Sequence, residues 1–171
     1  MKELFLIRHA KSSWSDSSLD DIDRPLNGRG RRDAPFMGQL LKGKGHQPAK
    51  LVSSPANRAY STAKAIAAEL DIEVADIKVE PAIYEAWTEE IMSVIRGLSD
   101  KWPSVALFGH NPTFTNVANL FAEKYIPNMP TCSICRIESS AGSCKEFSDE
   151  NSTLTNFYFP KQYFSWSLDK D

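Results

Sequence analysis

The sequence has no excess of charge of either sign and no long hydrophobic run. Its 171 residues include 20 Lys and Arg against 22 Asp and Glu, for a formal net charge of -2. This balance lacks the basic excess that draws proteins to nucleic acids or anionic membranes, so we expect neither as a partner. The apolar run at residues 4–7 is too short for a signal-peptide core or a membrane span. We therefore predict a cytoplasmic protein.

The sequence also has few cysteines and lacks several nucleotide- and phosphate-binding signatures. Cys132, Cys135 and Cys144 are odd in number, which argues against a disulfide framework. Cys132 and Cys135 match C-x-x-C, but neither a second pair nor a nearby histidine completes a four-ligand zinc site. We predict two small apolar side chains on a strand, with a metal or redox role as the alternative. No G-x-G-x-x-G follows the first predicted strand, so we set a dinucleotide-binding domain aside, and the P-loop and cysteine-phosphatase signatures are absent too. We expect no cofactor.

Short apolar segments alternate along the chain with segments of helical periodicity. The predicted strands are 3–8, 50–53, 77–79, 104–108, 133–137 and 155–159, and the predicted helices are 30–41, 54–68, 88–98 and 113–123. Helices separate the early strands but not the last two. This order predicts one α/β domain over residues 1–171, a three-layer α/β/α sandwich with a mostly parallel central sheet and a late antiparallel element. The aromatic residues Tyr163, Phe164 and Trp166 are expected to pack on its surface.

Side chains suited to phosphoryl chemistry follow three of the predicted strands. Arg8 and His9 end the first, residues 53–54 lead from the second to Arg58, and His110 follows the fourth. Open parallel sheets bind ligands outside the carboxyl ends of their strands, so we expect these side chains to share one crevice. Two guanidinium groups and two imidazoles are suited to holding and transferring a phosphoryl group.

In such a crevice His9 is the expected nucleophile. A neutral imidazole attacks phosphorus well, and hydrolysis then proceeds by forming and breaking a phosphohistidine. Arg8, Arg58 and His110 are expected to stabilise the charge on the phosphoryl oxygens, so the chemistry needs no metal. Each residue taken alone also fits a structural role, since a histidine after a strand or an arginine on a helix is common.

Four motifs occur in order within residues 4–112. They are Leu6-Ile7-Arg8-His9-Ala10-Lys11-Ser12, Arg24-Pro25-Leu26-Asn27-Gly28-Arg29-Gly30, Ser53-Ser54-Pro55-Ala56-Asn57-Arg58-Ala59-Tyr60-Ser61-Thr62-Ala63 and Gly109-His110-Asn111-Pro112. In kind and order they resemble the histidine phosphatase superfamily, also called phosphoglycerate mutase-like, and within it the SixA-type phosphohistidine phosphatases. Alanine stands in the third place of the Arg-His-Gly signature.

The resemblance implies a role for each matching residue. It makes His9 the phosphoryl acceptor, Arg8 and Arg58 the phosphate clamp, and His110 the residue that completes the pocket. It also places Ser12 and Asn111 beside the phosphate, where they are expected to bind substrate.

The resemblance also implies a general acid, and Glu85 alone falls near its place. The neighbouring glycine and the long lid insertion of larger members are missing. Glu85 is therefore either the acid or an exposed residue at the start of a helix. A missing acid favours phosphohistidine, whose imidazole leaves easily once protonated, over alkyl phosphates.

A phosphorylated protein is therefore the expected substrate and partner. The alternatives are a small-molecule phosphomonoesterase of the same superfamily and a non-catalytic phosphate-binding module. A module of that kind is expected to lose the nucleophile while keeping the arginines, whereas His9 is present. A mutase needs a closed site, and no insertion in the sequence is long enough to close one.

Overall fold

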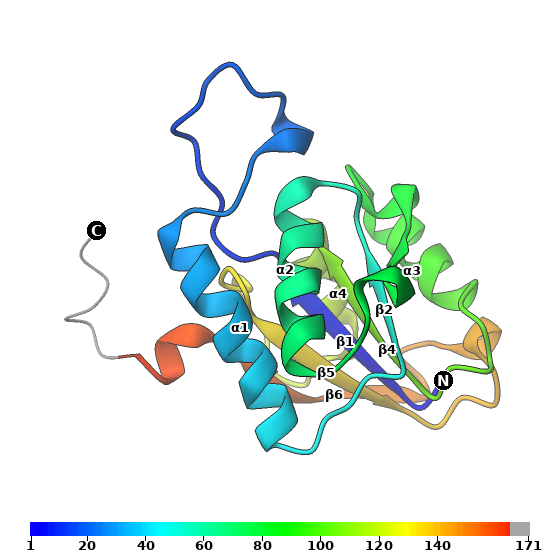
Figure 1. The fold of residues 1–171 in the computed structure, drawn as a ribbon. Coiled ribbons are helices and arrows are strands. Elements are labelled where there is room, and N and C mark those ends of the chain that lie inside the picture. The colour runs from blue at the N-terminus through cyan, green and yellow to red at the C-terminus, as the bar shows by residue number, and fades with distance from the viewer. Residues whose placement is uncertain (165–171) are drawn as a thin grey trace.

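The computed structural model describes residues 1–164, which form a six-stranded sheet covered by helices on both faces (Figure 1). The strands are β1 (Glu3–Arg8), β2 (Lys50–Ser53), β3 (Lys78–Val79), β4 (Ser104–Gly109), β5 (Ile134–Ser139) and β6 (Ser152–Tyr158). The α-helices within these residues are α1 (Gly28–Gly43), α2 (Asn57–Glu69), α3 (Thr88–Arg96) and α4 (Thr113–Phe121). None of the helices in this range is long and apolar enough to cross a membrane.

The sheet has the strand order β3-β2-β4-β1-β5-β6. β1 through β4 pair in parallel, whereas β5 is antiparallel to β1 and β6 is antiparallel to β5. The predicted mixed sheet with a late antiparallel element is thus confirmed. Because β2, β4 and β1 are neighbours, their carboxyl ends lie side by side, with Arg8 opposite Gly109 and Ser53 opposite Phe108.

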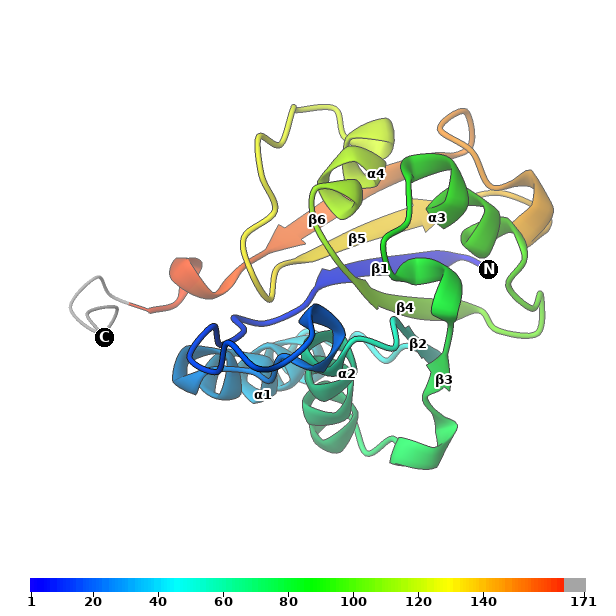
Figure 2. The same ribbon diagram turned by 90° about the horizontal axis from the view of Figure 1, so that it is seen from above.

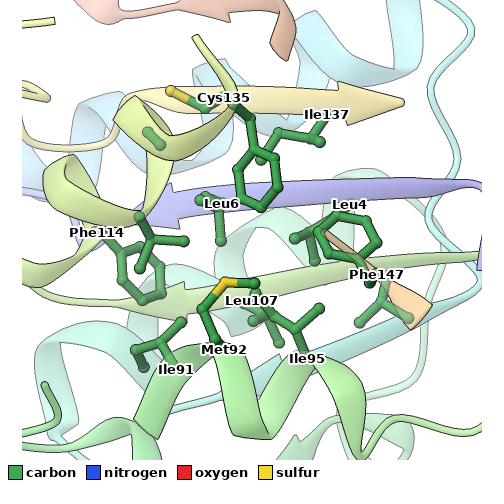
Figure 3. Close-up of a cluster of buried hydrophobic side chains, with 14 of the residues drawn as sticks. Leu4, Leu6, Ile91, Met92, Ile95, Leu107, Phe114, Cys135, Ile137 and Phe147 are labelled. Atoms are coloured by element: carbon green, nitrogen blue, oxygen red, sulfur yellow. The ribbon is translucent and has the colours of Figure 1, made fainter. Parts of the chain in front are cut away.

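Each face of the sheet is covered by one pair of helices, α1 and α2 on one side and α3 and α4 on the other (Figure 2). The central strand β1 contributes side chains to the cores on both faces of the sheet, since successive side chains of a strand point to opposite sides. Leu4 and Leu6 lie in the core beneath α3 and α4, where Figure 3 shows them near Met92 of α3. Phe5 and Ile7 lie in the core beneath α1 and α2. The continuous apolar run is therefore that of a strand buried on both faces.

Several element boundaries differ from the predictions. α1 runs through Gly43, and the turn that follows it contains Gly45 at φ 76°. α2 begins at Asn57, not near residue 54, because the Ser54 hydroxyl accepts a hydrogen bond from the Ala56 N–H in the turn before the helix. β6 begins at Ser152, earlier than predicted.

The cysteine prediction is right for one residue of the pair. Cys135 lies on β5 and is buried, but Cys132 precedes the strand at φ 61° and is also buried. Near the C-terminus, Tyr163 and Phe164 pack on Phe36 of α1, with ring centroids 5.7 and 4.7 Å apart. Trp166, predicted to pack with them, lies outside the described residues.

Candidate active site

Residues at three strand ends meet at one edge of the sheet. The His9 N–H, directly after β1, donates to the Gly109 carbonyl at the end of β4 over 3.0 Å. The Ser54 N–H, after β2, donates to the Phe108 carbonyl of β4 over 3.0 Å. The rings of His9 and His110 lie with their centroids 5.3 Å apart. The strand ends therefore bring the two predicted histidines into one site.

His9 is held in a single tautomer. Its Nδ1 lies 2.7 Å from the Ala10 carbonyl oxygen, which only accepts, so Nδ1 carries the proton and Nε2 keeps its lone pair. The Ala10 N–H donates to the Thr62 hydroxyl of α2 over 2.9 Å and so fixes this turn. Burial lowers the pKa of His9 to about 3, although the hydrogen bond to Ala10 opposes the shift. His9 is therefore neutral near pH 7.

The second histidine is oriented by Ser54. Its Nε2 lies 2.7 Å from the Ser54 hydroxyl oxygen, which already accepts from the Ala56 N–H. The Ser54 O–H is therefore able to donate to Nε2, and the ring proton of His110 then lies on Nδ1. Burial, followed by the charge of Arg58, lowers the pKa of His110 to about 4.

Two arginines flank the histidines, and each keeps a buried donor unused. Arg8 donates from Nη1 to the Met129 carbonyl over 2.7 Å. Arg58 donates from Nη1 to the Asp21 carbonyl over 2.7 Å and from Nη2 to the Asp21 carboxylate over 3.0 Å. Among the described residues, the buried side-chain polar atoms without a hydrogen-bond partner are Nε of Arg8, Nε of Arg58, Nδ1 of His110 and the hydroxyl of Ser133. Three of these four atoms are donors in the candidate site, and an oxyanion accepts from such donors.

Three residues that the predictions missed hold this arrangement together. Asp21 lies in the loop between β1 and α1, which projects beyond the carboxyl end of the sheet (Figure 1). Its carboxylate accepts from Arg58, from the Tyr84 hydroxyl over 2.7 Å and from Nε of Arg24 over 3.1 Å. Burial opposes ionisation, but these donors lower the pKa of Asp21 to about 2. The spacing of Asp21 and Arg24, three residues apart in a turn, is the sequence signal that was available for this pair.

The two predicted substrate-binding residues bond to other parts of the protein. The Ser12 hydroxyl is buried and accepts from Nη1 of Arg24 over 2.8 Å. The Asn111 amide donates to Asn128 and to the Met129 carbonyl, and its oxygen accepts from Thr115. Asn111 thus braces the carbonyl that holds Arg8. Substrate binding by Ser12 or Asn111 stays a prediction.

Glu85 lies beside His110, outside the hydrogen-bonded network. It is exposed, adopts φ 56°, and lines a hollow of about 260 Å³ together with Trp87 and His110. It precedes α3, whose first turn is capped by Glu90 through a bond from the Trp87 N–H. In the described residues, no group of three or more His, Cys, Asp or Glu side chains is placed to hold a metal ion.

Comparison with known proteins assigns the family. The model of the histidine phosphatase superfamily (branch 1) matches residues 4–99. An uncharacterised chloroplastic protein of Arabidopsis thaliana is 31% identical over 153 residues, which cover 85% of this chain and 70% of the relative. The chain therefore belongs to the histidine phosphatase superfamily.

Solved structures place the chain more closely within that superfamily. SixA of Agrobacterium tumefaciens, named as a putative phosphohistidine phosphatase, is 26% identical and superposes with a TM-score of 0.78 over 93% of this chain and 98% of its own. A protein histidine phosphatase SixA complexed with tungstate shares the fold at 19% identity, with a TM-score of 0.75 over 91% and 95% of the two chains. The chain is a SixA-type member of the superfamily and a phosphatase.

Proposed function

We propose that this phosphatase carries the phosphoryl group on His9, needs no metal, and acts on protein phosphohistidine. The observation that carries the proposal is the set of unpartnered donors on Arg8, Arg58 and His110 around a histidine whose Nε2 bears a lone pair. A nucleophile and oxyanion donors in one buried site are the parts that phosphoryl transfer requires.

In the proposed first step, Nε2 of His9 forms a bond to phosphorus. The bond from phosphorus to the substrate nitrogen breaks, and its electron pair returns to that nitrogen. The substrate imidazole leaves as a neutral base because its other ring nitrogen carries a proton taken from solvent. Arg8, Arg58 and His110 donate to the phosphoryl oxygens, whose negative charge spreads in the transition state. In the second step water attacks the phosphorus, its proton is lost to solvent, and inorganic phosphate leaves as His9 regains its lone pair.

The surroundings of the site favour a protein substrate. Trp14 and Trp87 are 72% and 79% exposed. Trp14 stacks on Arg24, which contacts Asp21 and Ser12, and Trp87 lines the hollow beside His110. Exposed indole rings are enriched in surfaces that bind proteins. The unpartnered Nε atoms of Arg8 and Arg58 support the metal-independent chemistry, because two guanidinium groups are able to offset the charge of the phosphoryl oxygens.

The experiment is to trap the intermediate. Wild-type protein mixed with a phosphohistidine peptide should acquire an acid-labile, base-stable phosphate on its own chain. His9→Ala should acquire none and should lose turnover. His46→Ala is the matched control, because His46 lies outside the site and should keep normal turnover. Normal turnover by His9→Ala refutes the assignment of His9 as the nucleophile. Loss of wild-type activity in EDTA, restored by a divalent metal, refutes metal independence.

The same preparation tests the substrate class. The peptide should be turned over with a higher kcat/KM than a sugar phosphate. The reverse order favours a small-molecule phosphomonoesterase and overturns the phosphohistidine assignment.

A further inference from the structure

A basic pocket adjoins the candidate site on the side of Arg8. It has a volume of about 230 Å³, and we define it by its cationic side chains, Arg8, Lys11, Arg29, Arg32 and Lys161. It is also lined by Thr131, in the segment that leads into β5. Because β5 and β4 flank β1 on opposite sides, the basic pocket and His110 lie on opposite sides of His9.

Two of the cationic side chains of this pocket, Lys11 and Arg29, form no ion pair with a carboxylate within residues 1–164. Asp33 is its one lining carboxylate among the described residues, and it is buried and paired with Arg32 at 2.8 Å. The Arg29 guanidinium donates instead to the Thr131 hydroxyl over 3.4 Å. The whole chain has a net charge of -2, so the cluster is local.

The proposed chemistry at His9 does not account for these charges. Arg8, Arg58 and His110 supply the donors that the phosphoryl group needs, and Lys11 and Arg29 lie outside that set. Uncompensated cations at a cleft attract and orient anionic partners. Arg8 belongs to both places, so an anionic group in the basic pocket lies next to the phosphoryl group at His9.

We propose that the basic pocket binds acidic side chains that flank the phosphohistidine of the protein substrate. This inference rests on the proposed function, and it adds a partner of stated chemistry: a phosphorylated protein with Asp or Glu near the modified histidine. Separate cations spread around a pocket suit several carboxylates, and the exposed indoles near the site favour a protein surface over a small bisphosphate.

The direct test is binding of a labelled Glu-rich peptide that carries no phosphate. Wild type should bind it, and the double variant Lys11→Gln/Arg29→Gln should bind about tenfold more weakly at low salt, since it lacks two cations that pair with the peptide carboxylates and salt screens such pairs little there. The matched control is Lys42→Gln/Lys50→Gln, which removes two charges at the opposite end of the sheet and should bind normally.

Turnover separates this inference from the proposed function. The double variant should hydrolyse p-nitrophenyl phosphate like wild type, and its loss on an acidic phosphohistidine peptide should appear in KM. Equal binding by wild type and the double variant overturns the acidic-substrate inference whatever the turnover. The inference is also overturned if binding of a small bisphosphate depends on Lys11 and Arg29 while binding of the Glu-rich peptide does not. Failure of wild type to turn over any phosphohistidine peptide, while it binds the Glu-rich peptide through Lys11 and Arg29, overturns the proposed function and leaves an acidic-protein site.

Discussion

The two arginines of the candidate site have opposite electrostatic surroundings. Arg58 is held by the carboxylate and the carbonyl of Asp21, and Tyr84 donates to the same carboxylate. Arg8 is held by a neutral carbonyl, that of Met129, and opens on the basic pocket. Within residues 1–164, the Arg58 guanidinium is thus paired with an acidic residue, and the Arg8 guanidinium is not.

This difference separates two tasks. The Asp21 carboxylate fixes the direction of the Arg58 guanidinium but weakens its attraction for an anion, since it offsets the positive charge. The Arg8 side keeps its full charge, which favours capture of an anionic group. We therefore expect Arg58 to act mainly by position, and Arg8 together with the basic pocket to act mainly by charge.

In the comparison of the two sides, the largest expected effect is the loss of either arginine. Arg8→Ala and Arg58→Ala should each lower kcat/KM by roughly 10²- to 10³-fold, about 3–4 kcal/mol, because each removes charged donors to the phosphoryl oxygens. Arg58→Ala should be the worse variant, since the negative charge of the Asp21 carboxylate then stays beside the site without the Arg58 charge that offsets it. Steady-state kinetics with p-nitrophenyl phosphate measures both.

A double variant sharpens that comparison. Asp21→Asn should recover part of the activity lost in Arg58→Ala and none of that lost in Arg8→Ala, since Arg58 pairs with Asp21 and Arg8 does not. Equal rescue of both variants contradicts the asymmetry.

The two histidines between the arginines make stability depend on pH. Burial is the leading cause that lowers the folded-state pKa of His9 to about 3 and of His110 to about 4, below the unfolded value near 6.5. From pH 7 to pH 5 the unfolded chain binds protons that the folded chain does not. The free energy of unfolding should therefore fall by about 2 kcal/mol per histidine across that window.

Urea unfolding at both pH values gives this quantity. The fall should shrink in His9→Gln/His110→Gln, and an unchanged fall in that variant rules out the two site histidines as its source.

A smaller effect should follow when the Arg58 side of the site loses the acidic charge of Asp21 and so resembles the Arg8 side. Asp21→Asn keeps the shape and the backbone carbonyl that holds Arg58, but removes the negative charge. Tungstate should then inhibit about fivefold more tightly, a change of about 1 kcal/mol. Asp71→Asn, which breaks the exposed pair with Lys42, is the control and should not change inhibition. Weaker inhibition of Asp21→Asn by tungstate contradicts the claim that the Asp21 carboxylate offsets the positive charge of Arg58.

The central strands and the histidine pair were predictable from local sequence. Leu4–Ile7 and the run in β4 are continuous and apolar because both faces of these strands are buried. The residue after each strand then falls at the sheet edge, which places His9 and His110. Asp21 was not predictable in this way, since its partner Arg58 is 37 residues away and the contact depends on how the β1–α1 loop folds. The start of α2 was misplaced because Ser54 has the local features of a helix start but bonds instead to Ala56 and His110.

The smallest expected effect concerns Glu85, which is either a general acid or an exposed residue before α3. It is exposed and lines the hollow beside His110, so a leaving group in that hollow is within its reach. A general acid matters in proportion to the leaving group's need for a proton, and neither phosphohistidine nor p-nitrophenyl phosphate needs much help. If the site is built for phosphohistidine, Glu85→Gln should keep turnover of both within about threefold of wild type, and an alkyl phosphate should already be a poor substrate of wild type. Efficient hydrolysis of a sugar phosphate by wild type, lost by about 10²-fold or more in Glu85→Gln on that substrate alone, identifies Glu85 as the acid. In that case the hollow at His110 holds a sugar leaving group, and the basic pocket at Arg8 serves a small anionic substrate in place of a protein.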